Sequence, residues 1–239
     1  MPTDQAMIAE LLPTSVASAD AFEDAPDATL WPGEQATVAH ALERRRREFT
    51  TARVCARAAL ARLGIEPAAI VADQRGVPVW PTGIVGSITH CEGYRAAAVA
   101  RESDVVTIGV DAEPNEPLPS GVLPLVSRAE ERIHLARLAA ERPDVCWDRL
   151  LFSVKESVYK AWFPLTRRWL GFEHAFVTLD PGTGTFRAHL RDVASVAGLT
   201  GFRGRWLVRD GLALTATTIT DVSEGAFDAL ADHASRRRP

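Results

Sequence analysis

The chain has 239 residues, of which 46% are hydrophobic and 24% are charged. This size and composition exclude a disordered or fibrous protein and are typical of a globular protein that buries a sizeable core. The net charge of −4 disfavours a general nucleic-acid binder, which needs a strong excess of basic residues.

The first residues and the cysteines indicate the compartment. Residues 1–5 lack the basic start and apolar stretch of a signal peptide, and no apolar run approaches the roughly 20 residues that span a bilayer. Cys55, Cys91 and Cys146 are odd in number and lack CxxC spacing, so neither a disulfide framework nor a zinc site is indicated. We therefore expect a cytoplasmic protein.

The first quarter of the chain is expected to contain one long helix. The pattern predicts a short helix at residues 7–12, a strand at 15–21 and a helix from Pro32 to Gly64. The long helix carries the arginine run 44–47, and such a run is usually a solvated helix face. A second interpretation is that one side of the helix presents guanidinium groups that suit phosphate, namely Arg45 or Arg46 with Arg53 and Arg57.

The next stretch combines a turn, a glycine-flanked polar segment and a strand. Residues 75–81 form a turn and an extended segment, and residues 94–100 read as a strand of small residues. Between them, Gly86 precedes Ser87, Thr89 and His90, an arrangement that suits close approach of a ligand to the backbone. The alternative is a tight turn with His90 hydrogen-bonded in the core.

A strand at residues 105–110 ends in two acids that point to the same side. Asp111 and Glu113 are two residues apart, and strand side chains alternate between faces. Two such charges repel by roughly 4 kcal/mol at about 4 Å with an effective dielectric of 20. Water, an arginine or a hard cation should compensate this repulsion. Pro114 then begins a loop that reaches residue 126.

Two helices follow, at residues 127–142 and around residues 152–162, the second stopped by Pro164. The second helix holds the only two lysines among 27 basic residues, Lys155 and Lys160. Retained lysine in an arginine-rich chain indicates that its compact ammonium is required. Structurally, Ser153 and Glu156 fit a capping box, and Glu156 and Lys160 fit a surface salt bridge.

The rest of the chain is predicted to be β-rich, with strands at 174–179, 185–190, 204–208 and 212–219 and a hairpin turn at Asp210-Gly211. A short helix is expected after residue 221. Residues 49–57 match residues 152–160 in spacing, which suggests two related α+β halves with a site between them. We expect an N-terminal half at 1–113 and a C-terminal half at 114–239.

Four segments in this order resemble the 4′-phosphopantetheinyl transferases, specifically the monomeric Sfp-like type that activates polyketide and peptide synthetases. They are Gly76-Val77-Pro78-Val79-Trp80-Pro81, Gly86-Ser87-Ile88-Thr89-His90, Ile108-Gly109-Val110-Asp111-Ala112-Glu113 and Phe152-Ser153-Val154-Lys155-Glu156-Ser157-Val158-Tyr159-Lys160. The resemblance covers residues 75–165, and the arginine helix extends it to about residue 44. It implies an α+β fold whose two similar halves are related by a pseudo-two-fold axis, with the active site in the cleft between them.

The resemblance also implies a reaction and its cofactors. Coenzyme A would donate its phosphopantetheine arm to a serine of an apo acyl or peptidyl carrier protein and release 3′,5′-ADP. Asp111, Glu113 and Glu156 would hold Mg²⁺ or Mn²⁺, and oxygen ligands suit these hard cations. Glu156 would accept the proton of the serine, and Lys160 would stabilise the leaving phosphate.

The cofactor-binding residues that the resemblance implies lie in all four segments and in the arginine helix. They are Arg45, Arg53, Arg75, Ser87, Thr89, His90, Asp111, Lys155 and Lys160. Some relatives carry a further lysine where this chain has Val71-Ala72, and Arg75 is the nearest cation there. Residues 162–172 interleave aromatic side chains with arginines and would dock an acidic carrier protein.

Two other functions use the same residues. The three carboxylates could serve a Mg²⁺-dependent phosphohydrolase or nuclease, in which water replaces the serine. The chain could also bind coenzyme A or carrier proteins without catalysis. A chain that builds its own cleft is expected to act as a monomer.

Overall fold

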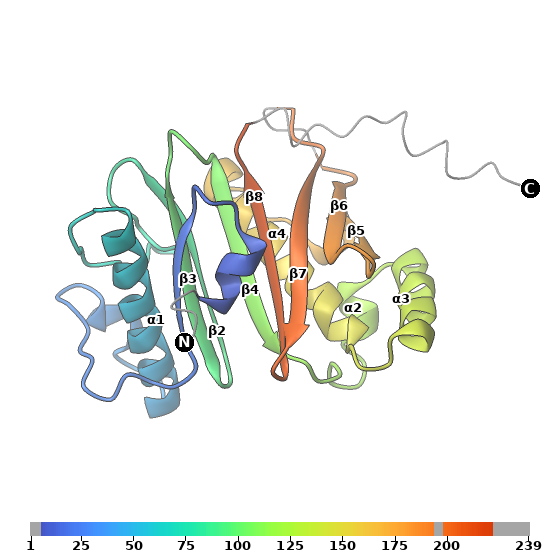
Figure 1. Cartoon of the computed structure of the whole chain (residues 1–239), viewed down its shortest axis with the longest axis horizontal. Helices are drawn as coiled ribbons and strands as arrows, with labels where there is room; N and C mark the ends of the chain where they lie inside the picture. The colour runs from blue at the N-terminus through green and yellow to red at the C-terminus, as the bar shows by residue number, and fades with distance from the viewer. Residues whose placement is uncertain (1–5, 194–197, 222–239) are drawn as a thin grey trace, which may run out of the picture.

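The computed structural model describes residues 6–193 and 198–221, which form two antiparallel sheets and the helices that cover them (Figure 1). The first sheet has the order β1-β3-β2 and the second the order β4-β8-β7-β6-β5. The strands are β1 (Ala17–Ala21), β2 (Ile84–Cys91), β3 (Tyr94–Arg101), β4 (Thr107–Pro114), β5 (Ala175–Asp180), β6 (Thr185–Leu190), β7 (Gly201–Arg209) and β8 (Leu212–Ile219).

Each sheet is covered by one long helix. The helix α1 packs on β1 and β3, and α4 packs on β4 and β8. The helices are α1 (Glu43–Arg62), α2 (Leu123–Val126), α3 (Ala129–Glu141) and α4 (Trp147–Thr166), with 3₁₀ turns η1 (Met7–Leu11), η2 (Gln35–Val38) and η3 (Phe172–His174). The α+β prediction is therefore confirmed. None of these helices combines the length and the apolar character that crossing a membrane requires.

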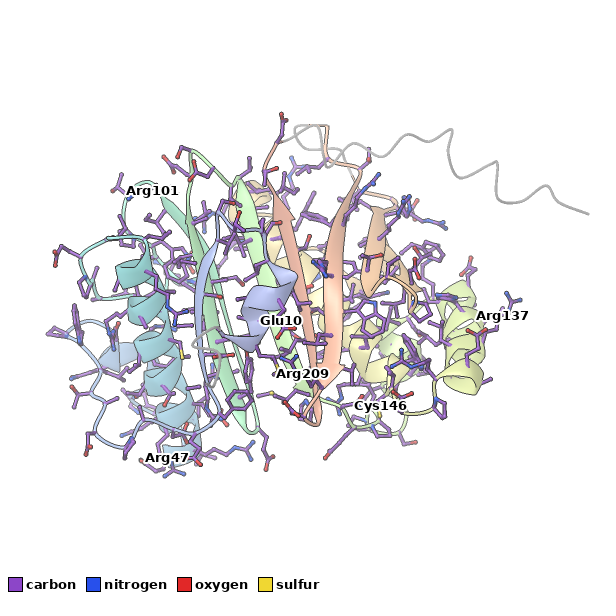
Figure 2. The ribbon with its side chains drawn as sticks, in the orientation of Figure 1. Glu10, Arg47, Arg101, Arg137, Cys146 and Arg209 are labelled. Atoms are coloured by element: carbon purple, nitrogen blue, oxygen red, sulfur yellow. The ribbon has the colours of Figure 1, made fainter. Side chains whose placement is uncertain are left out.

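The alanine run of β3 is explained by packing on both of its faces. Ala97 and Val99 contact the side covered by α1, whereas Ala96, Ala98 and Ala100 contact the side covered by η1. Small side chains let both layers approach the strand closely, so burial outweighs the weak β-propensity of alanine. The turn η1 is fastened to the end of β7 by Arg209, whose guanidinium lies 2.6 Å from Glu10 (Figure 2).

The two sheets meet along the edge strands β2 and β4. The hydroxyl of Ser87 accepts a hydrogen bond from the backbone N–H of Val110 at 3.1 Å. The hydroxyl of Thr89 accepts one from the N–H of Ala112 at 3.0 Å. Side chains of one sheet thus satisfy backbone donors at the edge of the other, where no strand pairing is available.

A glycine brings α4 into direct backbone contact with β4. A Cβ atom added at Gly109 would lie 1.8 Å from the carbonyl oxygen of Ser157 and 2.9 Å from the nitrogen of Ala161. Only glycine leaves room for the helix at this distance. The close approach places the side chains of α4 beside the acidic end of β4.

Several predicted boundaries were wrong for identifiable reasons. The arginine helix begins at Glu43 rather than near Pro32, because residues 35–38 form the separate turn η2. The helix α4 continues through Pro164 to Thr166, where Arg167 ends it in the left-handed conformation with φ of 55°. Ser153 lies inside α4 and bonds Thr215 at 2.9 Å, so it is not a capping residue. The helix expected after residue 221 falls outside the described residues.

The topology assigns β4 to the C-terminal sheet. Residues 107–114 pair with β8 from Thr107–Ile219 to Pro114–Leu212. The sheets therefore part between β3 and β4. The division of the chain into halves at 1–113 and 114–239 stays a prediction. The pseudo-two-fold relation between the halves stays a prediction.

Candidate active site

A pocket of about 560 Å³ lies between the two sheets, with walls from both halves of the chain. The helices α1 and α4, the strands β2 and β4 and the loop 73–80 all contribute residues to its wall. Cationic side chains from these elements reach the pocket, namely Arg45, Arg53, Arg75, Lys160 and Arg167. Aromatic side chains complete it, namely Phe49, Trp80, Tyr159 and Phe163.

The polar segment of β2 is held against the loop by Trp80. Its indole N–H donates to the carbonyl oxygen of Gly86 at 3.0 Å. A Cβ at position 86 would lie 2.7 Å from the Trp80 ring, so glycine is required for the ring to approach the strand this closely. Gly86 therefore allows the Trp80 side chain to approach β2 closely. This role is separate from the ligand contact that the sequence suggested for this segment.

Asp111 is the centre of the acidic end of the site. Its side chain is buried, and Oδ1 accepts hydrogen bonds from Lys160 Nζ at 2.7 Å and Thr89 Oγ1 at 3.3 Å. The other oxygen, Oδ2, is buried and has no hydrogen-bond partner among the described residues. A buried carboxylate oxygen without a partner is costly, so this atom is suited to receive a further cation or donor.

Two glutamates, Glu113 and Glu156, lie close enough to Asp111 for its charge to raise their pKa. Burial and the charge of Asp111 raise the pKa of Glu113 to about 7, against the lowering effect of Arg149. The same two causes raise the pKa of Glu156, and Lys160 opposes them. Arg149 donates to Glu113 Oε2 at 3.0 Å. The repulsion expected between Asp111 and Glu113 is therefore present, and Lys160 and Arg149 compensate part of it.

The chemistry of these donors fits a hard divalent cation. Three carboxylates supply only oxygen atoms, and one of those oxygens is buried without a partner. Within residues 6–193 and 198–221, however, no three His, Cys, Asp or Glu side chains are gathered closely enough to hold a metal ion. Convergence of all three acids on one ion stays a prediction.

A basic cluster from α1 and β2 lines the pocket. The guanidinium of Arg45 contacts both ring nitrogens of His90, which also lies 3.6 Å from Glu48. Burial and the charge of Arg45 lower the pKa of His90 to about 4, so this imidazole is neutral at pH 7. Arg53 is buried over the Phe49 ring, and burial lowers its pKa to about 10. This cluster can bind an anion.

Lys155 is the residue whose position differs most from the expectation. Its ammonium is fully buried and donates to Glu131 Oε2 at 2.8 Å and to the carbonyl oxygen of Phe172 at 2.9 Å. It therefore ties α4 to α3 and η3 and does not line the pocket. Lys160 pairs with Asp111 instead of forming the expected surface bridge with Glu156.

Three other predicted binding residues are already engaged in structural contacts. The hydroxyls of Ser87 and Thr89 join the two sheets. Arg75 donates to the carbonyl oxygen of Arg167 at 3.3 Å, and Arg167 donates to Asp73 at 3.0 Å. Arg75 thus connects the loop to the end of α4 at one side of the pocket, together with Asp73 and Arg167.

Arg149 is a site residue that the sequence reasoning missed. It lies on α4 seven residues before Glu156 and eleven before Lys160, so helical periodicity places the three on one face. The sequence contains one indication of this residue. Repulsion between Asp111 and Glu113 has to be compensated, and an arginine is one of the groups that can do so.

Comparisons with known proteins agree on one family. Residues 33–100 match the family model described as 4′-phosphopantetheinyl transferase N-terminal domain, and residues 107–204 match the 4′-phosphopantetheinyl transferase superfamily. The division between these matches falls where the two sheets part.

Three curated relatives cover nearly the whole chain. The 4′-phosphopantetheinyl transferase Svp of Streptomyces mobaraensis is 54% identical, over 89% of this chain and 89% of its own. Npt of Nocardia iowensis is 48% identical, over 88% and 98%. PptT of Mycobacterium tuberculosis is 45% identical, over 89% and 98%. All three relatives are named as 4′-phosphopantetheinyl transferases.

Proposed function

This chain belongs to the 4′-phosphopantetheinyl transferase superfamily, and from that membership we infer that it transfers the phosphopantetheine group of coenzyme A to a serine of a carrier protein. The reaction would require Mg²⁺ and release 3′,5′-ADP. The observation that carries this proposal is the pocket between the sheets, which is lined by Arg45, Arg53 and His90 and by Lys160. Lys160 also pairs with Asp111, and so connects the pocket to the acidic end of β4.

The basic cluster would bind the phosphates of coenzyme A. Arg45 and Arg53 supply fixed guanidinium groups, whose planar forks suit phosphate oxygens. His90 is neutral at pH 7, so its ring would act through a hydrogen bond rather than through a full charge. The aromatic side chains that line the pocket offer contact area for the uncharged parts of the cofactor.

The acids would hold the metal. Asp111, Glu113 and Glu156 are the residues proposed to bind Mg²⁺, with water completing its coordination. When bound, the metal would neutralise charge on the pyrophosphate during transfer of the phosphoryl group. The unpartnered Oδ2 of Asp111 supports this assignment.

Glu156 is proposed as the general base for the serine hydroxyl, directly or through a water. Burial raises the pKa of this carboxyl, which brings it closer to the working pH and makes it a better proton acceptor. Lys160, held at 2.7 Å from Asp111, would stabilise the leaving phosphate with its ammonium.

The carrier protein is proposed to dock on the exposed part of residues 162–172. Trp162, Phe163 and Leu170 are buried and belong to the core, whereas Trp169 is 74% exposed and Arg168 is also exposed. An aromatic side chain beside a cation suits an acidic surface with an apolar contact. Reversing the charge of Arg168 should raise the KM for the carrier protein but not for coenzyme A. An unchanged KM would refute this docking surface.

Both walls of the pocket come from one chain, which supports a monomeric enzyme. The decisive experiment for the reaction is mass spectrometry of an apo carrier protein incubated with the enzyme, coenzyme A and Mg²⁺. Transfer of a phosphopantetheine group should add about 340 Da to the carrier protein. Formation of 3′,5′-ADP with no added mass would indicate a hydrolase, and coenzyme A binding without either product would indicate a non-catalytic binder.

A further inference from the structure

Arg149 fastens the acidic end of β4 to the first turn of α4. Its Nη1 donates to Glu113 Oε2 at 3.0 Å, its Nε donates to the carbonyl oxygen of Glu116 at 3.0 Å, and its Nη2 donates to that of Pro117 at 3.1 Å. Each of the three guanidinium nitrogens therefore has one acceptor. The Arg149 and Glu113 side chains are 17% and 19% exposed, so their contact is largely shielded from water.

The same arrangement is found at Asp111. There Lys160 and Thr89 occupy Oδ1, and Oδ2 is left without a partner in the described part of the chain. At Glu113, Arg149 occupies Oε2, and Oε1 has no hydrogen bond to any residue in the described ranges. Each of the two acids thus has one oxygen held by a resident cation and one oxygen without a hydrogen-bond partner in the described part of the chain.

A carboxylate with one oxygen occupied can give a metal ion only its other oxygen. Mg²⁺ demands a nearly regular octahedron and is satisfied by single oxygens and waters. Ca²⁺ is larger, takes six to eight oxygens and readily uses both oxygens of one carboxylate. A carboxylate that is restricted to one oxygen therefore favours Mg²⁺ over Ca²⁺.

We propose that Arg149 is a positioning residue that restricts Glu113 to one open oxygen and thereby selects Mg²⁺ over Ca²⁺. The inference rests on the proposed function, because it takes Glu113 as a ligand of the catalytic metal. Arg149 would thereby influence which metal ion binds. Its hydrogen bonds to the carbonyl oxygens of Glu116 and Pro117 would not have this effect by themselves.

The test compares metal affinities rather than activity. Isothermal titration of the full chain saturated with coenzyme A, with MgCl₂ and separately with CaCl₂, gives the two dissociation constants for each variant. In Arg149→Met, loss of a group that orients a ligand should weaken Mg²⁺ binding by about tenfold or more. Ca²⁺ binding should be retained or strengthened, because both oxygens of Glu113 become free. The ratio of the two constants is the diagnostic quantity.

Two further variants control for folding and charge. Arg149→Lys keeps the charge and can keep one bond to Oε2, so it should retain the preference for Mg²⁺ and serves if Arg149→Met does not fold. Arg142→Met removes an exposed arginine whose partner is Asp144 at 3.0 Å, and it should leave both constants unchanged. Melting temperatures measured without metal show how much each change affects stability alone.

If Arg149→Met weakens the binding of Mg²⁺ and Ca²⁺ equally, or changes neither dissociation constant, the inference is overturned. Either result would show a purely structural role for Arg149 and would leave the proposed function intact. A wild-type chain that binds neither metal would refute the metal assignment itself, and the inference with it. The mass-shift experiment then decides separately whether the chain transfers phosphopantetheine.

Discussion

His90 is held in its neutral form at pH 7 by its surroundings in the pocket. Burial first and then the positive charge of Arg45 lower its pKa to about 4, from an ordinary value of 6.5. The unfolded chain therefore binds a proton between pH 6.5 and about 4, whereas the folded chain does not. The contribution of His90 to the free energy of unfolding is therefore fully present above pH 6.5. It decreases as the pH falls toward 4.

A bound phosphate should reverse this shift. We expect the pKa of His90, measured by NMR titration of the ring nitrogens, to be about 4 in the free protein and higher with 3′,5′-ADP, since a nearby anion favours the imidazolium. The imidazole of His134, which contacts the carbonyl oxygen of Leu179 at 3.0 Å outside the pocket, serves as the internal control. A pKa of His90 that is the same with and without the nucleotide would show that no phosphate binds beside it.

At the scale of elements, the contact between α4 and β4 decides the geometry of the acids. Asp111 comes from β4, and Glu156 and Lys160 come from α4, so their distance depends on how closely the helix lies on the strand. Gly109 makes the approach possible, because an added Cβ would meet the Ser157 carbonyl oxygen at 1.8 Å.

Substituting Gly109 with Ala should therefore displace α4 from β4. We expect a large loss of transfer activity together with a lower melting temperature, because neither backbone can yield without breaking helix or strand hydrogen bonds. The matched control is Gly182→Ala in the β5–β6 turn, where the nearest atom to an added Cβ lies at 3.3 Å. Full activity in Gly109→Ala would show that this contact does not set the geometry of the site.

The opposite side of α4 is fixed by a buried ion pair. The side chains of Lys155 and Glu131 are both fully buried, and Glu131 also accepts hydrogen bonds from the backbone N–H groups of Arg128 and Val177. Burial lowers the pKa of Lys155, and the charge of Glu131 opposes this effect. The pair joins α3, α4 and β5 through hydrogen bonds that are shielded from water.

Removing one partner of this pair leaves an uncompensated buried charge. We expect Lys155→Met to lower the free energy of unfolding by about 3–5 kcal/mol in denaturant titration, with little change in the KM for coenzyme A. The double variant Lys155→Met with Glu131→Met should recover part of the loss, because no lone charge remains. A raised KM in a variant of normal stability would instead assign Lys155 to the cofactor.

At the scale of the whole molecule, the site exists only where the two sheets meet. The edges β2 and β4 are joined by the hydroxyls of Ser87 and Thr89 and not by strand pairing. The loop 73–80 adds a second connection through Asp73 and Arg167. Joining two edges by a few side-chain bonds leaves space between the layers for a pocket.

Ser87→Ala tests the junction without touching the acids. The variant leaves the backbone N–H of Val110 buried and unpaired, which should cost about 1–3 kcal/mol of folding free energy. The KM for coenzyme A should change little, since the hydroxyl already serves Val110. Ser103→Ala is the control, because its hydroxyl bonds Asp104 in an exposed position. A higher KM with unchanged stability would favour a phosphate contact for Ser87.

Local patterns along the chain predict most of its helices and strands, and the order of its motifs indicates the family. The predicted strand at residues 105–110, the Asp210-Gly211 turn and the helical spacing of residues 152–162 are local patterns. They correspond in turn to β4, the β7–β8 hairpin and α4. The motif order carried the family resemblance, since it depends on the identity and order of residues rather than on their contacts.

Which elements and side chains pair with one another follows from the three-dimensional fold and not from local patterns. The pairing of β4 with β8, of Lys155 with Glu131 and of Arg149 with Glu113 joins residues 24 to more than 100 positions apart in the chain. Helical and strand periodicity repeats over a few residues, so it shows which side of an element is buried but not what covers it. Lys155 and Lys160 illustrate this. Both lie on α4, yet Lys155 pairs with Glu131 of α3 and Lys160 pairs with Asp111 of β4.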